Sequence, residues 1–145
     1  MAFGFARYDL TQITRRLELL EVSPDPKKPI TLIVRGAGEG NRAWTSAVFR
    51  RPTEPQAERS SPWHDEAGRE RIAEIFAESI IVGWENVFDD QAPTEPVPFS
   101  VEAVQGFLVE LITHAPDVWR RCVFDPVFNK GLFRPSVDPV DLGKG

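Results

Sequence analysis

His64, Asp65 and Glu66 stand together in the sequence, and these are side chain types that bind metal ions or transfer protons. The only other histidine is His114, and no His-Glu-x-x-His spacing is present. Three consecutive side chains at the start of a helix point in different directions, so they cannot converge on one ion. We therefore expect no metal site here and interpret Asp65 and Glu66 as residues that favour a helix N-terminus through its dipole.

Three other features could carry chemistry, and each has a simpler explanation. Cys122 is the only cysteine and has no histidine nearby in the sequence, so a buried small side chain explains it better than a nucleophile. The glycine-rich run at residues 36–40 follows a predicted strand, but the dinucleotide fingerprint requires a third glycine where Asn41 stands. The acidic residues between 85 and 95 lack the spacing of an EF-hand calcium loop. We expect neither an enzyme nor a cofactor or metal.

Composition is typical of one soluble domain. The 145 residues are 41% hydrophobic and 27% charged, which suffices to bury a core. No run approaches the roughly 18 apolar residues of a membrane span, and the first ten residues do not resemble a signal peptide. A single cysteine excludes an internal disulfide and fits a reducing compartment.

The formal charge of −5 is unevenly distributed along the chain. Residues 1–51 contain 9 Lys and Arg against 5 Asp and Glu, whereas residues 52–145 contain 8 against 17. The larger part of the chain is therefore acidic and would repel the phosphates of nucleic acid. The basic pairs are scattered, as expected of a solvated surface, so we predict no nucleic-acid partner.

The N-terminal part predicts a short β-hairpin over about residues 16–35. The second strand, residues 29–35, is rich in β-branched residues, and a turn with two prolines precedes it. A competing interpretation is a helix that starts at Asp9, because apolar residues recur there at helical spacing. A short helix over residues 10–15 that leads into the first strand would reconcile the two.

The remainder predicts about four helices, so the expected fold is α+β and mainly α-helical, in a single domain over residues 1–135. Asn41 and Ser100 are the expected N-caps of two of these helices, and Asp125 is expected to cap a fresh start within the last one. Prolines and polar residues mark a linker over residues 51–65, and residues 136–145 have too few apolar residues to be more than a flexible tail. The helices are predicted over residues 42–50, 66–84, 100–114 and 116–130.

The helix predicted over residues 66–84 has more apolar residues near its end than one face can bury. Ile72, Ile75, Phe76 and Gly83 share one stripe, and the acidic residues that follow Trp84 would end the helix. Ile81 points to the opposite side and Trp84 to a flank. These two positions therefore predict a contact beyond the packed face.

Aromatic residues are numerous, with 4 Trp and 10 Phe, and several lie beside linkers or off the core stripe. Large aromatic rings are also the side chains that dominate protein interfaces. We expect a shallow apolar groove for a partner, with Trp84 more important than Trp63, which lies in the proline-rich linker. The predicted groove residues are Ile81, Trp84, Phe88, Phe99, Phe107 and Trp119.

The order of these segments resembles the tail assembly chaperones of long-tailed bacteriophages and prophages, over roughly residues 29–134. In that family a helix ends in Gly-Trp, a turn follows, a Val/Ile-Pro-aromatic-Ser/Thr sequence begins the next helix, and a phenylalanine closes the domain. The segment 88–99 departs from the family's tight acidic turn, since it is longer and has no glycine. The matching positions here are Gly83, Trp84, Val97, Pro98, Phe99, Ser100 and Phe133.

The resemblance implies a non-catalytic protein of the host cell cytoplasm that binds the tape measure protein and keeps it soluble while the tail tube polymerises. The tail tube protein and a frameshifted longer form of the chain are further partners that it implies. It leaves a homo-oligomer open, and it implies neither nucleic acid nor membrane. The alternative function is a structural phage tail subunit, such as a tail tube, completion or connector protein, which would require a longer β-rich body.

Overall fold

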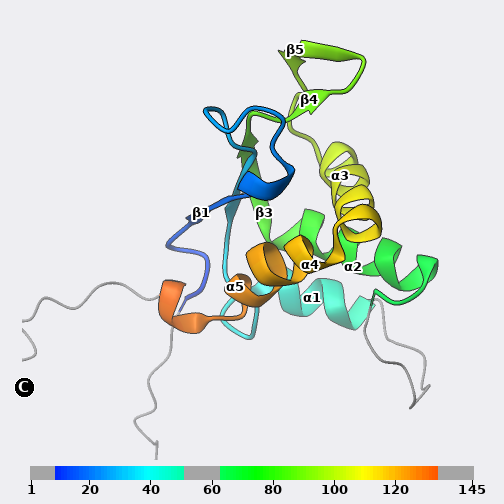
Figure 1. Ribbon diagram of the computed structural model, residues 1–145. Helices are drawn as coiled ribbons and strands as arrows, with labels where there is room; N and C mark the ends of the chain where they lie inside the picture. Colours follow the sequence, from blue (N-terminus) through cyan, green and yellow to red (C-terminus); the bar gives the residue numbers. More distant parts are fainter. Residues whose placement is uncertain (1–8, 51–62, 134–145) are drawn as a thin grey trace, which may run out of the picture.

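The predicted N-terminal hairpin is present in the computed structural model, which describes residues 9–50 and 63–133 (Figure 1). Strands β1 (Arg15–Glu18) and β2 (Thr31–Val34) pair antiparallel, and the short 3-10 helix η1 (Leu20–Val22) lies between them. Residues 10–13 form a turn, so the alternative of a helix from Asp9 is wrong. Backbone hydrogen bonds to the 36–40 loop hold Leu10 in place instead.

A third strand, β3 (Ile81–Glu85), pairs antiparallel with β2, and the strand order in the sheet is β1-β2-β3. The prediction of one helix over residues 66–84 is therefore wrong at its C-terminal end. Helix α2 (Glu66–Ser79) ends where a run of β-branched residues begins, and such residues favour a strand that a neighbouring strand can pair. That neighbour is β2, distant in sequence, so helical spacing alone could not reveal it.

A β-bulge between β2 and β3 decides where Trp84 points. Leu32 pairs with Trp84, and Val34 pairs with Ile81. The two pairs are two residues apart along β2 but three residues apart along β3. The extra residue on β3 places Ile81 and Trp84 on the same face of the sheet, which regular alternation would forbid. Because Leu32 and Val34 are fully buried, that face is the core face.

The acidic segment after β3 forms a second hairpin, where only a connector was expected. Strands β4 (Phe88–Asp89) and β5 (Ala92–Pro96) pair antiparallel and project beyond the three-stranded sheet (Figure 1). Asn86 begins the turn into it with a φ of 62°, a conformation that asparagine tolerates. Its side chain amide donates to the carbonyl of Pro29, which ties the turn to the start of β2.

Helices α1 (Arg42–Arg50) and α2 begin at side chain caps, of which Asn41 was predicted as a cap and Asp65 only as a residue that favours a helix N-terminus through its dipole. The Oδ1 atom of Asp65 accepts a hydrogen bond from the backbone N–H of Gly68 at 2.7 Å, so Asp65 is the N-cap of α2. Asn41 accepts from the N–H of Trp44 at 3.2 Å and caps α1, whose bounds match the prediction of residues 42–50. Polar side chains at both starts thus have structural roles.

Asn41 also joins three segments, because its buried amide nitrogen donates to the carbonyls of Gly36 at 3.0 Å and of Ser79 at 2.9 Å. We expect Asn41→Ala to lower the free energy of unfolding by about 2 to 3 kcal/mol, since it removes a cap and leaves two carbonyls without a donor. Urea denaturation measures the loss. Asn41→Ser retains a capping oxygen and should lose less; equal stability of Asn41→Ala and the unmodified chain would contradict this role.

Helix α3 (Val101–His114) matches its predicted bounds, and Ser100 caps it by accepting from the N–H of Ala103 at 3.0 Å. The C-terminal helix is continuous from α4 (Pro116–Val118) through a π-helical segment, η2 (Trp119–Phe124), to α5 (Asp125–Val127). The predicted fresh start capped by Asp125 is therefore wrong, since the N–H of Asp125 bonds back to the carbonyl of Arg120. The wide turns keep Trp119, Val123 and Val127, spaced by four residues, buried together.

The helices pack against one face of the sheet, with α2 in contact with both α1 and α3 (Figure 1). The α+β, mainly helical fold with a short N-terminal hairpin is as predicted. A 3-10 helix, η3 (Lys130–Phe133), ends the described chain with Phe133 in the core. Most of the predicted linker 51–65 and the predicted tail 136–145 lie outside the described residues. The largest fully buried side chains are Leu10, Leu19, Leu32, Phe76, Ile80, Leu108, Ile112, Trp119 and Phe133.

Candidate partner-binding surface

Trp84 is half-buried at the edge of the core and its indole is fixed by a hydrogen bond. The Nε1–H donates to the carbonyl of Val97 at 3.0 Å, across the base of the β4–β5 hairpin. The N–H of Val97 in turn donates to the carbonyl of Val87. A satisfied indole N–H lets the ring lie at a boundary between core and solvent without a desolvation penalty.

Two phenylalanines pack on Trp84 with their rings edge-on. The ring centroids of Phe99 and Phe107 each lie 5.7 Å from that of Trp84, with interplanar angles of 89° and 67°. Phe99 directly precedes the Ser100 cap of α3 and Phe107 lies in the middle of the helix, so the position of α3 places both rings. Edge-to-face pairs of this kind add specific stabilisation to the area that they bury.

Part of this cluster is open to solvent. The exposed fraction is 41% for Phe99 and 44% for Val101, the first residue of α3. We name as the Trp84 patch the contacting residues Trp84, Val97, Phe99 and Phe107, together with the exposed Val101 that follows Phe99 by two residues. Large apolar side chains that stay exposed together are typical of interaction sites.

The structure brings together only three of the six predicted groove residues, namely Trp84, Phe99 and Phe107. Ile81 is 3% exposed and Trp119 is fully buried, so their prediction as groove lining is wrong. The sheet pairing covers Ile81, and the π-helical turns carry Trp119 inward. Phe88 lies in β4, where it lines a different hollow.

Trp63 is more important to the fold than its place in the linker suggested. Its ring is half-buried and makes T-shaped contacts with Trp119 at 5.9 Å and with Phe124 at 4.8 Å between centroids. Trp63 does lie in the turn before α2, but this position does not keep its ring out of the core, so the expectation that Trp63 matters much less than Trp84 loses its basis. A tryptophan next to a predicted helix start was the signal that could have indicated this contact.

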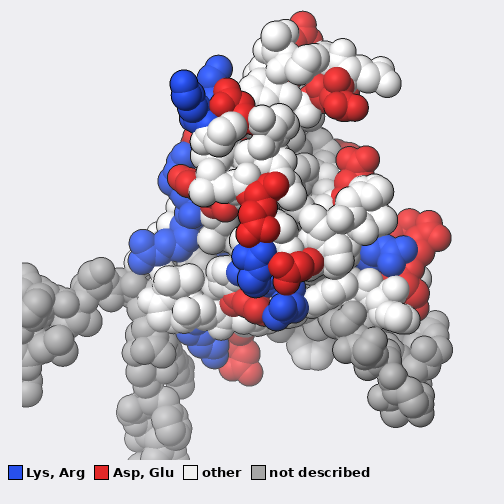
Figure 2. Space-filling model, viewed as in Figure 1, with Lys and Arg blue, Asp and Glu red and all other residues white. Residues whose placement is uncertain are grey.

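Acidic side chains dominate the part of the chain that forms the Trp84 patch. Residues 72–119 contain nine Asp and Glu and no Lys or Arg. In Figure 2, red and white atoms cover the β4–β5 hairpin and the upper turns of α3, whereas many blue atoms lie over β1 and the loop that follows and others lie among red atoms over the C-terminal helix and α2. The patch therefore lies in a negative potential.

A hollow of about 410 Å³ lies between the β1–β2 loop and the β4–β5 hairpin. Its walls combine three carboxylates with one lysine and apolar side chains. Within the described ranges, no group of three or more His, Cys, Asp or Glu side chains is arranged to hold a metal ion. The lining residues are Pro24, Asp25, Lys28, Asn86, Phe88, Asp89, Asp90, Pro93 and Thr94.

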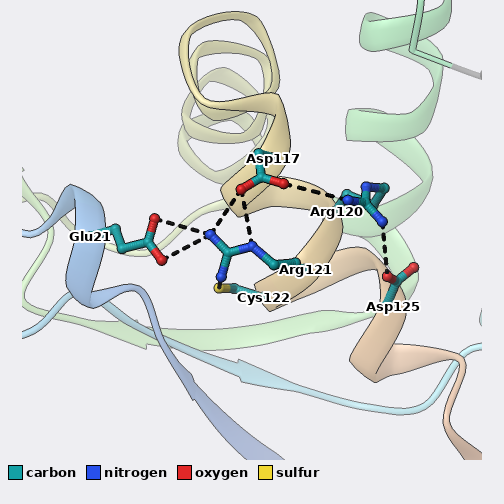
Figure 3. A network of polar contacts seen from close by, with 6 residues as sticks. All are labelled: Glu21, Asp117, Arg120, Arg121, Cys122 and Asp125. Atoms are coloured by element: carbon teal, nitrogen blue, oxygen red, sulfur yellow. Dashed lines mark hydrogen bonds and ion pairs between the residues drawn. The ribbon is translucent and has the colours of Figure 1, made fainter.

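An ion-pair network on the surface joins η1 to the C-terminal helix (Figure 3). Arg121 donates to Glu21 at 2.8 Å and to Asp117 at 3.0 Å, and Arg120 bridges Asp117 to Asp125. Half-buried Cys122 lies beside this network, with the Arg121 guanidinium 3.9 Å from its Sγ. The hydrogen bond from Arg121 lowers the pKa of Asp117, and that from Arg16 lowers the pKa of Glu85.

These two lowered carboxyl pKa values predict acid sensitivity. A carboxyl whose pKa is lower in the folded than in the unfolded state stabilises the fold above its unfolded pKa, and this stabilisation is lost as the pH falls through the folded pKa. We therefore expect the melting temperature to decrease as the pH falls below about 4.5. Melting curves of the double variant Asp117→Asn, Glu85→Gln should change less over this range, and an identical decrease would contradict the assignment.

The chain matches no protein-family model, and comparisons with curated proteins and with solved structures give no significant match. None of the helices in residues 9–50 and 63–133 is long and apolar enough to cross a membrane. Function is therefore inferred from the residues of this chain and from their arrangement.

Proposed function

We propose that this protein is a tail assembly chaperone of a long-tailed bacteriophage or prophage. In this role it binds the tape measure protein in the host cytoplasm and keeps it soluble until the tail tube has formed around it. The tail tube protein and a frameshifted longer form of the chain are further partners in the same proposal. Its action is non-catalytic.

The Trp84 patch is the observation that carries this proposal. Phe99 exposes part of its ring where it packs on Trp84, Phe107 packs on the same indole, and Val101 at the start of α3 is a second exposed apolar side chain. A helical client that aggregates through apolar faces needs such a surface, and an amphipathic helix can lie on it. The rigid indole, held by Val97, keeps the surface in place before a client arrives.

The mainly helical fold favours a chaperone over a structural tail subunit. A subunit that builds rings would need a larger β-rich body, whereas the three-stranded sheet in the described residues has strands of only four or five residues. Far-ultraviolet circular dichroism of the whole chain separates the two functions. A spectrum dominated by strand would count against the chaperone.

Co-expression of this chain with a tape measure protein from the same phage or prophage tests the proposal directly. We expect the client to move from the insoluble to the soluble fraction and to co-purify with the chain. Expression of the client with an unrelated acidic protein of similar size is the control. Equal insolubility of the client with and without the chain would refute the proposed function.

A further inference from the structure

Gly106 is a glycine in the middle of α3 that the packing of this chain does not explain. A Cβ atom added there would meet nothing within 4 Å, so neither a close neighbour nor a turn requires glycine. A glycine inside a helix costs about 1 kcal/mol relative to alanine. The position is exposed, so a surface of α3 has been left without side chain cover.

Two acidic residues flank this bare position on the same side of the helix. Glu102, Gly106 and Glu110 are spaced by four residues and all are exposed, so they form one stripe along α3. Within the part of the chain that the structure describes, neither glutamate has an ion pair. By contrast, Glu85 and Asp117 each pair with an arginine.

The stripe adjoins the Trp84 patch through Phe107. Glu110 follows Phe107 by three residues on α3, so the two side chains are neighbours on the helix surface. On the hairpin side of the patch, Asp90 and Glu95 are also exposed and have no ion pair among the described residues. An apolar surface, a helix face open to close approach and unpaired carboxylates on both sides are thus continuous.

We propose that this stripe and the Trp84 patch together bind a cationic amphipathic segment of the partner. Apolar side chains of the segment cover Phe99 and Val101, its backbone passes close to Gly106, and its Lys or Arg side chains reach Glu102 and Glu110. Charge complementarity selects this occupant, because residues 72–119 contain no cation to neutralise the carboxylates. The identity of the partner as the tape measure protein rests on the proposed function, whereas the chemistry of the segment does not.

The test uses purified chain and two synthetic amphipathic peptides of equal length, with the same leucine face and either Lys or Glu on the polar face. Isothermal titration calorimetry at low and at high salt measures binding. We expect the Lys peptide to bind and to lose about tenfold in affinity at high salt, because exposed ion pairs are screened. Equal binding of the Glu peptide would overturn the proposal.

Two variants locate the site. The double variant Glu102→Gln, Glu110→Gln should bind the Lys peptide with about tenfold lower affinity. The matched control Glu18→Gln with Glu70→Gln removes the same charge at exposed positions elsewhere and should bind as the unmodified chain does. Gly106→Gln should raise the melting temperature and yet weaken binding, because a better helix former now covers the stripe. Unchanged binding by either α3 variant would overturn the proposal.

A second copy of the chain is the competing occupant, and sedimentation of the chain alone tests for it. A salt-sensitive dimer that Glu102→Gln with Glu110→Gln dissociates would assign the stripe to self-association and overturn the proposal. Because no client is used, the peptide result is independent of the chaperone function. If the chain binds the Lys and Glu peptides equally but still keeps the tape measure protein soluble, only this inference is refuted. If the chain binds the Lys peptide selectively but does not keep the tape measure protein soluble, only the chaperone function is refuted.

Discussion

Replacing Phe99 and Val101 together by serine should leave the chain folded but abolish the proposed ability to keep the tape measure protein soluble. Both residues are about two-fifths exposed, so their removal should cost less stability than removal of fully buried core side chains. The same change removes most of the apolar surface that a client helix would cover. We expect the soluble fraction of a co-expressed client to fall to the level without chaperone, while the melting temperature changes by only a few degrees.

The matched control for this variant uses two apolar residues that are also exposed but lie elsewhere. Val48 and Phe49 on α1 are 36% and 78% exposed. Helix α2 packs against both α1 and α3, so this control lies on a different helix from the Trp84 patch. Val48→Ser with Phe49→Ser should leave client solubility unchanged. If this control loses activity and the Phe99, Val101 variant retains it, the partner surface lies on α1 and the Trp84 patch is not the site.

Trp119→Ala should destabilise the fold more than any other single change proposed. Trp119 is fully buried, and its ring contacts Trp63, Phe76 and Phe124 with centroid distances of 5.9, 4.9 and 5.9 Å. Removal of the indole empties the centre of an aromatic cluster that joins α2 to the C-terminal helix. We expect a loss of about 3 to 5 kcal/mol in the free energy of unfolding, measured by urea denaturation.

Trp119→Phe distinguishes packing from hydrogen bonding at this position. Among the described residues, no acceptor is within reach of the buried Nε1–H, so phenylalanine removes a polar group that makes no bond there. The smaller ring retains much of the packing, and we expect it to cost less than half as much as alanine. Equal losses in the two variants would mean that the indole N–H has a partner that stabilises the fold.

Local signals predicted most of the elements. The caps Asn41 and Ser100 marked helix starts that the structure has at the same residues, because a capping side chain bonds to a backbone N–H only three residues away. The N-terminal hairpin was also predictable from a β-branched run after a proline turn. Each of these features depends on interactions between residues that are close in sequence.

The error over residues 80–85 had a long-range cause. The apolar run Ile80, Ile81 and Val82 follows α2 without a break, and only the pairing with β2, some fifty residues earlier, makes residues 81–85 a strand. The prediction that Ile81 and Trp119 line a groove was wrong for a similar reason. Pairing in the sheet turns Ile81 toward the core, and a π-helical segment buries Trp119. The cluster of Trp84, Phe99 and Phe107 was named from the sequence, although its geometry was not.

The sequence by itself determined the fold class, the helix caps, the hairpin and the concentration of acid around an aromatic-rich segment, because these follow from residue type and local spacing. Only the tertiary structure decided that residues 81–85 form a strand, that a bulge turns Ile81 and Trp84 to the same face, and that α3 presents Gly106 between two exposed glutamates. The reason is physical. Which side of an element is covered depends on partners distant in the chain, and their positions are fixed only when the core packs.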